Sequence, residues 1–374
     1  MFGTEQPTMD FGLTRHQCRR TRWSWSLKRG ALIVVAFCVI NFIYLRFTRI
    51  QCCQVYRHDS YHGNTEAKTG DSTTGGHDLT DAKLEAFVRS GQVLNEYQFV
   101  VNSEVCSSSG VPQSVYVVAI VPSKPSHFQE RQAIRETWGS QFNKNEKLKL
   151  IFLSGLAEEI TNKNISVERE TFFDVVQANF IDSYKNLTRK TNAMLQWSKQ
   201  FCSQARFVMK IDDDVFLESG NLIRMLQLME GESRAIIGYA RDPVEEPIRD
   251  NSNKWYLSRD QYPFERFPRF VHGPSYVISR DLVTDLYEIS RHAPRIYLED
   301  VYVTGLCAHI ARATLVGTSG FATGLGYSPV WYMSESAVTS HDFTPLAMRR
   351  LWHLLQVWRS WRPSFKYIGA VIGY

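Results

Sequence analysis

Short apolar runs alternate with segments of helical spacing through the middle of the chain. The runs are near-continuous and rich in β-branched residues, as in strands that are buried on both faces. They occupy residues 115–121, 148–155, 170–180, 206–211 and 234–240. Apolar residues recur every three or four positions in other stretches, which predicts helices. These stretches are 126–139, with Ser126 as N-cap, 186–201, 219–229, 280–290 and 345–361. Strands alternating with helices predict an α/β domain with a mainly parallel sheet.

A longer apolar run covers residues 31–45, and Asn41 is its only clearly polar member. As a helix it would be roughly 22 Å long, slightly shorter than the endoplasmic reticulum hydrocarbon core of about 27 Å. Six basic residues precede the run, so the chain before it is expected to stay in the cytosol. A cleaved signal peptide and a buried core helix are the alternatives. The basic segment of about 30 residues and the lack of an A-x-A site disfavour the first, and the polar chain that follows disfavours the second.

The pattern therefore predicts four parts: a cytosolic tail over 1–30, a transmembrane signal-anchor over 31–47, a stem over 48–109 and a luminal domain over 110–374. The stem is polar, rich in Gly, Thr and Asp and weakly periodic, which predicts flexible chain. Within it, residues 80–88 are expected to form a short helix, because apolar residues recur there at helical spacing.

Composition and cysteine usage narrow the picture only slightly. The chain is 44% hydrophobic and 22% charged, as in globular proteins. Its net charge of +5 reflects a local basic cluster before the apolar run, so no nucleic-acid partner is expected. The lack of a C-x-x-C pair argues against a zinc site. Disulfides persist in an oxidising lumen, but the sequence leaves the pairing open among Cys52, Cys53, Cys106, Cys202 and Cys307. Two sequons predict glycosylation at Asn164 and Asn186.

Three consecutive acids, Asp212, Asp213 and Asp214, directly follow the predicted strand 206–211. In an open α/β sheet, ligands bind beyond the carboxyl ends of the strands. Adjacent carboxylates repel one another unless a cation or hydrogen-bond donors compensate them, and oxygen ligands suit Mg²⁺ or Mn²⁺. A solvated acidic turn is the alternative, and for an isolated triplet it is the commoner one.

Three further motifs accompany the triplet in a fixed order. The four motifs are RQAIRETWG (131–139), FIDSYKNLTRKT (180–191), RFVMKIDDDVF (206–216) and YLEDVYVTG (297–305). With them the chain resembles the Golgi β-1,3-glycosyltransferases, which transfer galactose or N-acetylhexosamine from a UDP-sugar. The resemblance covers about residues 115–311. It implies a GT-A fold, in which a nucleotide-binding, mainly parallel sheet is flanked by helices and preceded by one transmembrane helix and a flexible stem.

The resemblance also implies a metal site at the triplet. Asp214 would be the direct ligand of Mn²⁺ or Mg²⁺, and Asp212 a further one. Asp212 and Asp213 would also assist on ribose, sugar or water. Similar enzymes complete the site with a histidine near the C-terminus, and His341 in VTSHDFTP is the best candidate. A surface histidine in a loop is the alternative.

Glu299 and Asp300 match the EDV motif of the family, so Asp300 carries over as the general base. An acceptor hydroxyl must lose its proton as it attacks the anomeric carbon, and a positioned carboxylate can take that proton. A metal would offset the charge that develops on the leaving diphosphate. One base and one metal suffice for a single displacement with inversion. Glu299 is expected to bind substrate or to cap the helix that follows.

Other residues of the motifs are further candidates for substrate binding. Arg131 and Arg135 lie four apart on one helix face, where they could meet the nucleotide or an acidic cluster, or remain ordinary surface arginines. Lys210 could balance the charge of the acids or point to solvent. Gly273 should allow close approach to the sugar. Its segment departs from the family pattern, since Val271 occupies the usual cysteine position.

The sequence thus predicts a metal-dependent, inverting glycosyltransferase. It would transfer a hexose, with galactose favoured, from a UDP-sugar to a glycolipid or glycoprotein glycan in β-1,3 linkage. The expected location is the Golgi membrane, as a single-pass type II protein with a luminal catalytic domain. A UDP-N-acetylhexosamine donor is one alternative. An inactive glycan-binding protein is another, disfavoured because Asp212, Asp214 and Asp300 are intact. A phosphohydrolase is disfavoured because the triplet lacks an added acidic or histidine cluster before it.

Overall fold

The computed structural model describes residues 56–58, 79–107, 114–240, 245–323, 329–334 and 336–371. The predicted anchor over 31–47 lies outside these residues, as do Cys52 and Cys53. Within the described part of the chain, none of the helices has the length and apolar character needed to cross a membrane.

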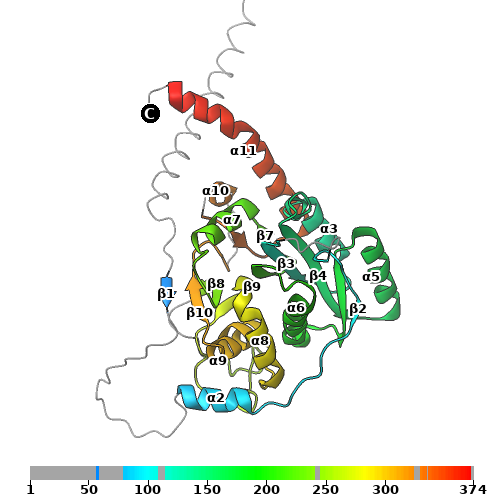
Figure 1. The fold of residues 1–374 in the computed structure, drawn as a ribbon, viewed down its shortest axis with the longest axis vertical. Helices are drawn as coiled ribbons and strands as arrows, with labels where there is room; N and C mark the ends of the chain where they lie inside the picture. The colour runs from blue at the N-terminus through cyan, green and yellow to red at the C-terminus, as the bar shows by residue number, and fades with distance from the viewer. Residues whose placement is uncertain are drawn as a thin grey trace, which may run out of the picture. The chain divides into compact units, whose positions relative to one another are not determined.

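One large sheet forms the centre of the described fold (Figure 1). Its strands are β1 (Tyr56–His58), β2 (Phe99–Val101), β3 (Val117–Pro122), β4 (Leu148–Leu156), β5 (Val175–Ile181), β6 (Phe207–Ile211), β8 (Ala235–Ala240), β9 (Val271–Ser279) and β10 (Thr314–Gly317). They lie in the order β1-β10-β8-β9-β6-β3-β4-β5-β2. β5, β4, β3 and β6 run parallel, and β8 and β10 share their direction because the antiparallel β9 separates β8 from β6. The sheet is therefore mainly parallel, as predicted, with β1, β2 and β9 opposed to the rest.

Helices pack on both faces of this sheet. The larger ones are α3 (Phe128–Glu136), α5 (Glu159–Phe172), α6 (Leu187–Phe201), α7 (Ser219–Leu228), α8 (Arg280–His292) and α11 (Pro345–Val371), and the short ones are α4 (Ser140–Asn143), α9 (Ala308–Ile310) and α10 (Pro329–Met333). Val118 and Ile120 of β3 join a core that includes α6 and α8, whereas Val117 and Val121 join a second core that includes α3, α7 and α11. Successive strand side chains point to opposite faces, so β3 must be apolar throughout.

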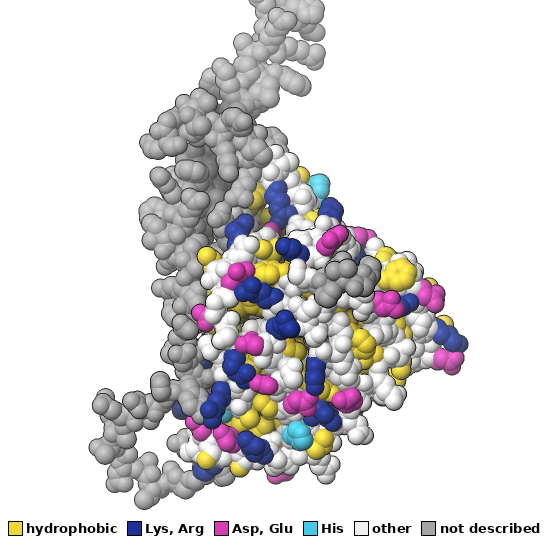
Figure 2. Space-filling model, in the orientation of Figure 1, with side chains coloured by type: hydrophobic (Ala, Val, Ile, Leu, Met, Phe, Trp, Pro, Cys, Tyr) yellow, Lys and Arg dark blue, Asp and Glu magenta, His cyan; other side chains and the backbone are white. Residues whose placement is uncertain are grey.

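Most predicted elements are confirmed, with shifted ends. The expected strand over 170–180 begins only at Val175, because α5 occupies the chain up to Phe172. Neither α5 nor β9 was predicted. The helix expected from Ser126 has His127 as its N-cap instead, and the His127 side chain makes no capping hydrogen bond. On the face shown in Figure 2, acidic and basic side chains of the described residues are interspersed.

The second half of the stem segment packs on the domain. α2 (Asp81–Arg89) confirms the short helix predicted there, and Thr80 caps it by accepting a hydrogen bond from the Lys83 backbone N–H. Leu84 and Val88 of this helix are buried in the main core. β2 pairs with β5 at the edge of the sheet. Ordered chain therefore begins before residue 110.

Two of the body cysteines form a disulfide. Cys106 pairs with Cys202, which joins the end of the stem segment to the chain after α6. Cys307 is a free cysteine and is buried. This resolves the pairing that the sequence left open for the cysteines within the described residues.

Candidate active site

The acidic triplet lies at the carboxyl end of β6, on the edge of the sheet where ligands bind in α/β proteins. A small second sheet brings the C-terminal part of the chain to the same place. There β7 (Phe216–Leu217) pairs with β11 (Thr339–Ser340). The Phe343 backbone N–H donates to the Asp214 carbonyl over 2.9 Å. His341 is thereby placed near a triplet that precedes it by more than a hundred residues.

The first two acids each have partners inside the protein. The Asp212 carboxylate lies 2.7 Å from Lys210 Nζ. Asp213 Oδ2 accepts a hydrogen bond from Ser123 Oγ over 2.7 Å and lies 2.9 Å from His127 Nδ1. Burial alone would raise the pKa of Asp213, but the hydrogen bonds from His127 and Ser123 bring it below its usual value. Both carboxylates are thus held by the fold.

Asp214 differs from its two neighbours. Among the described residues its carboxylate has no hydrogen-bond or ion-pair partner. Burial raises the pKa of Asp214 to about 6, and the charges of Asp212 and Asp213 add to the rise, whereas His341 opposes it. A partly buried carboxylate surrounded by negative charge favours the approach of a cation.

Lys210 joins the triplet to the EDV motif. Lys210 and Tyr276 are directly paired across β6 and β9, so their side chains share one face of the sheet. Lys210 is completely buried, and its Nζ contacts Asp212, lies 3.5 Å from Glu299 Oε2 and donates to the Gly273 carbonyl. Burial would lower the pKa of Lys210, but Asp212 and Glu299 raise it above its usual value. Lys210 therefore balances the acids, and the solvent-facing alternative is wrong.

Two backbone N–H groups orient Asp300. Gly273 donates to Oδ2 over 3.0 Å and Val301 donates to Oδ1 over 2.9 Å. Asp300 itself is half-buried and precedes the π-helical segment η4 (Val301–Cys307). A Cβ at Gly273 would lie 3.3 Å from Asp300 Oδ2, so the close approach that the glycine permits is to the carboxylate. The arrangement leaves Asp300 a fixed, accessible proton acceptor.

Glu299 has a different environment from its neighbour. It is 3% exposed and accepts a hydrogen bond from the Tyr276 hydroxyl over 2.7 Å. Burial raises the pKa of Glu299 to about 7, although Lys210 acts in the opposite direction. Glu299 therefore supports Lys210 from inside the protein and does not face solvent.

Three metal ligands were predicted, and the structure brings them to one edge without closing a cluster. His341 is 20% exposed, and its Nδ1 lies 2.9 Å from Asp342 Oδ2. Among the described residues, no three His, Cys, Asp or Glu side chains are gathered closely enough to hold a metal ion. Asp212, Asp214 and His341 therefore do not form a preassembled metal site among the described residues.

Comparison with known proteins settles the family. The Galactosyltransferase family model matches residues 129–317. Over 264 residues the chain is 36% identical to beta-1,3-galactosyltransferase 1 of Homo sapiens, covering 69% of this chain and 78% of that protein. It is 34% identical over 247 residues to human beta-1,3-galactosyltransferase 5, covering 64% and 78%. The chain belongs to the galactosyltransferase family. It is a hexosyltransferase, and its family implies a sugar donor and a glycan acceptor.

Solved structures with a similar outline are more distant. Mouse xyloside xylosyltransferase 1 in its apo form is 14% identical and covers 61% of this chain and 97% of its own, with a TM-score of 0.31. The WbbM bifunctional glycosyltransferase is 11% identical and covers 67% and 47%, with a TM-score of 0.33. At these TM-scores neither structure establishes a common fold with this chain.

Two arginines of this hexosyltransferase that were predicted to bind substrate are engaged inside the protein. Arg131 is 1% exposed and pairs with Glu168, with its Nη2 2.6 Å from Oε2. Arg135 binds the Asp174 carboxylate through Nε and Nη2 over 2.8 and 2.7 Å, and also reaches Glu168. Their partners form an acidic pair, but it is not the triplet. The role of both arginines is structural.

Arg131 nevertheless acts on the site indirectly. Its guanidinium donates to the carbonyls of Lys124 and Pro125 and to Ser123 Oγ. These contacts fix the loop after β3, and Ser123 in turn holds Asp213. Sequence reasoning missed Ser123 and His127. Their position just beyond a buried strand, at the same sheet edge as the triplet, was the available signal.

A hollow of about 360 Å³ opens beside this loop. Lys124, Ser126, Glu158 and Asp182 are among its lining residues. It lies beyond the carboxyl ends of β3, β4 and β5, and the loop that lines it contacts the triplet through the hydrogen bond from Ser123 to Asp213. Lys190, which was also missed, forms part of its support: its ammonium lies 2.9 Å from Asp182 Oδ2 and donates to the Ser123 carbonyl over 3.0 Å.

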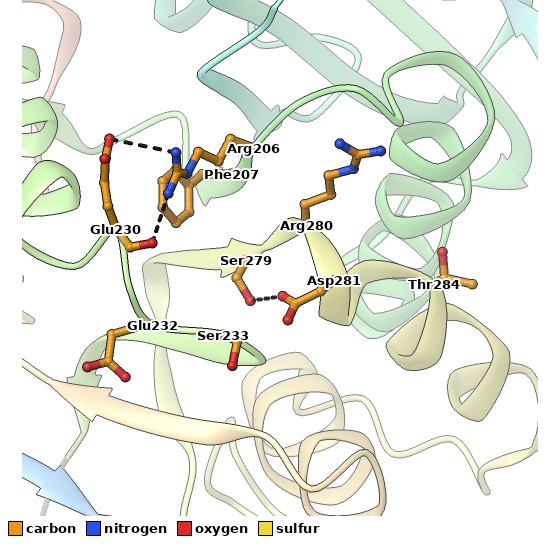
Figure 3. A pocket seen from close by; sticks show the side chains of 9 residues that line it. All are labelled: Arg206, Phe207, Glu230, Glu232, Ser233, Ser279, Arg280, Asp281 and Thr284. Atoms are coloured by element: carbon orange, nitrogen blue, oxygen red, sulfur yellow. Dashed lines mark hydrogen bonds and ion pairs between the residues drawn. The ribbon is translucent and has the colours of Figure 1, made fainter.

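A second hollow, of about 370 Å³, lies at the opposite end of β6 (Figure 3). Arg206 lines it and donates to the Glu230 carbonyl over 2.8 Å, while Ser279 donates to Asp281 over 2.6 Å. Because Arg206 precedes β6 and the triplet follows it, this hollow is separated from the acids by the length of the strand. It has no part in the chemistry below.

Proposed function

We propose that this hexosyltransferase has a GT-A fold and transfers galactose from UDP-galactose to a glycan acceptor in β-1,3 linkage, with inversion. The names of its relatives support the sugar and the linkage. The observation that carries the mechanism is the contrast between two carboxylates. Asp214 lacks a partner among the described residues, whereas Asp300 is held by two backbone N–H groups.

The donor nucleotide would occupy the hollow beyond β3, β4 and β5. Nucleotides bind at this position in open α/β sheets, and the loop that supplies Lys124 to the hollow also supplies Ser123 to Asp213. The diphosphate would then lie beside the triplet. A GT-A fold requires the diphosphate of the nucleotide to lie close to the acidic triplet.

Mn²⁺ or Mg²⁺ would be held by Asp214, with Asp212 and His341 at the same edge. Carboxylate oxygens are ligands that both ions prefer, and the unpartnered Asp214 carboxylate fits a cation. When bound, the ion would offset the charge that develops on the leaving diphosphate. The Lys210 ammonium, 2.7 Å from the Asp212 carboxylate, compensates its charge and keeps it in position.

Asp300 would serve as the general base. It accepts the proton of the acceptor hydroxyl while that oxygen forms a bond to the anomeric carbon. The bond between this carbon and the diphosphate oxygen breaks, and UDP leaves with the electron pair. The single displacement converts an α-linked donor into a β-linked product. The Gly273 and Val301 N–H groups hold the carboxylate in a fixed orientation.

The location is proposed from the sequence. The predicted anchor over 31–47 indicates a single-pass type II protein of the Golgi membrane with a luminal catalytic domain, which could act on glycolipid or glycoprotein glycans. The sequon at Asn164 is exposed on α5, so it can carry a glycan. Asn186 donates its side-chain amide to the Ile181 carbonyl over 2.8 Å, so its sequon is already engaged in the fold.

A donor and acceptor screen tests the proposal. The full-length chain in detergent is incubated with Mn²⁺, with UDP-galactose, UDP-N-acetylglucosamine or UDP-N-acetylgalactosamine, and with an array of glycan acceptors. The expected result is acceptor-dependent UDP release with UDP-galactose and a β-1,3 linkage in the product. Preference for an N-acetylhexosamine donor would overturn the galactose assignment. UDP release that no acceptor increases would overturn the transferase mechanism.

A further inference from the structure

Aromatic side chains from two separate segments lie around Tyr297, three residues before the base, and the mechanism above uses neither. Tyr184 in the short helix η3 (Tyr184–Asn186) is 58% exposed, and Trp255 is 46% exposed. A third aromatic residue, Tyr297, has its ring centroid 6.4 Å from that of Tyr184. Large aromatic side chains are usually buried in soluble domains, and neighbouring exposed ones often mark a binding surface.

These rings are close to the reacting carboxylate. Tyr297 is three residues before Asp300 in the same motif. Burial raises the pKa of Tyr184, and the negative charges of Asp300 and Asp212 add to the rise. Tyr184 therefore lies within electrostatic range of both the base and the triplet. Trp255 is brought to the same place by Tyr297, whose ring centroid lies 6.4 Å from that of Tyr184 and whose hydroxyl binds the carbonyls of Lys254 and Tyr256.

The exposed rings are also held in place. The Tyr297 hydroxyl donates to the carbonyls of Lys254 and Tyr256, over 3.0 and 2.5 Å, and so clamps the chain on both sides of Trp255. Arg249 donates to three further carbonyls of the same loop, those of Leu257, Tyr262 and Phe264. Ordering a side chain before its ligand arrives reduces the entropic cost of binding. An exposed tryptophan with such support is preorganised for a ligand.

We propose that Tyr184 and Trp255 form the subsite for the acceptor sugar and take a neutral pyranose. This inference rests on the proposed function. One face of a pyranose ring is lined by C–H groups and suits the face of an aromatic ring, while its hydroxyls need polar partners. The Lys254 ammonium lies over one face of the Trp255 ring, 4.2 Å from its centroid, so a sugar would stack on the opposite face. A sugar that stacks there presents a hydroxyl to Asp300.

Kinetics of the full-length chain test the subsite. The acceptors are methyl β-glycosides of galactose, N-acetylglucosamine and N-acetylgalactosamine, each titrated at saturating UDP-galactose. Tyr184→Ala and Trp255→Ala should each raise the KM for the acceptor by about 2- to 12-fold, the factor expected for loss of one aromatic contact. The KM for UDP-galactose should not change. Tyr184→Phe and Trp255→Phe, which keep a ring, should stay close to wild type.

Leu228→Ala provides a matched control. Leu228 is 82% exposed at the end of α7, and its loss removes exposed apolar surface without touching the site. An unchanged acceptor KM in both alanine variants would refute the subsite, as would an equal rise in the KM for acceptor and donor. If the wild-type chain transfers no sugar, the proposed function itself fails. If the wild type transfers galactose and Tyr184→Ala and Trp255→Ala have the same acceptor KM as Leu228→Ala, the subsite fails and the proposed function stands.

Discussion

Replacing Lys210 with methionine should destabilise the protein strongly, because the lysine is buried between acids. Its Nζ is 2.7 Å from Asp212 and 3.5 Å from Glu299, and its side chain has no exposed surface. Methionine fills a similar volume but carries no charge, so both carboxylates lose their cation. Breaking a buried ion pair by removing one partner costs about 3–5 kcal/mol. The expected loss of unfolding free energy in Lys210→Met lies in that range.

Two companion variants separate charge from volume. Lys210→Arg keeps the positive charge and should lose less stability than Lys210→Met. Adding Asp212→Asn to Lys210→Met removes the carboxylate that lies 2.7 Å from the lost ammonium, and should recover part of the lost stability. Non-additivity of this kind identifies residues that interact directly.

The assay is urea unfolding of the full-length chain in detergent, followed by tryptophan fluorescence at pH 7. Acceptor KM and kcat are measured on the same preparations. Two results would refute the reasoning: a loss below about 1 kcal/mol in Lys210→Met, the size expected of an exposed pair, or no recovery when Asp212→Asn is added. Either would mean that the buried charges are compensated by something other than Lys210.

The other predictions concern the remaining acids of the site. Asp300→Asn should lower kcat by about 10²–10⁴-fold, the usual contribution of a general base, while UDP binding measured by calorimetry with Mn²⁺ stays as in the wild type; wild-type turnover would remove Asp300 from its role. Asp214→Ala should abolish the dependence of UDP affinity on Mn²⁺, and equal affinities with and without the ion in the wild type would contradict the metal assignment. Because burial raises the pKa of Glu299 to about 7 from 4.5, the folded protein binds more protons than the unfolded chain between these values, and its stability falls as pH rises through that window. In Glu299→Gln the fall in melting temperature between about pH 4.5 and 7 should be shallower, and an unchanged slope would show that Glu299 ionises normally.

The alternation of strands and helices could be predicted from the sequence because each central strand is buried on both faces. β3 and β4 had to be apolar along their length, so their sequence pattern was unambiguous. α5 escaped notice because its buried positions are Thr161, Ile165 and Glu168, two of which are polar. A helix whose buried face holds a carboxylate paired with an arginine lacks the apolar periodicity from which helices are predicted.

β9 was hidden for a different reason. It contains Gly273 and Pro274, which normally argue against a central strand. The strand tolerates them because its first half serves the site: the Asp212 backbone N–H donates to the Pro274 carbonyl over 2.9 Å, and Gly273 bonds Asp300. The low strand propensity of Gly273 and Pro274 is outweighed here by contacts with residues far away in the chain.

Long-range placement also decided the roles of the candidate residues. Arg131 and Arg135 have the spacing of a binding pair, but the charges that meet them come from Glu168 and Asp174, in a segment whose helix was not foreseen. His341 is brought near the triplet by the two-residue pairing of β11 with β7 and by the hydrogen bond from the Phe343 N–H to the Asp214 carbonyl. No local pattern encodes a contact of that kind.

The acidic triplet shows most clearly what a motif can and cannot specify. The three carboxylates are chemically identical, and their order along the strand does not assign them tasks. Asp213 is bound by Ser123 and His127, which follow β3, and Asp212 pairs with Lys210 of β6. Asp214 is therefore the acid that has no partner among the described residues. The same Lys210 touches Glu299 and Gly273, and Gly273 aims Asp300. The separation between the cation-binding acid and the base is therefore set by one buried lysine and one glycine, which is why Lys210→Met should affect turnover as well as stability.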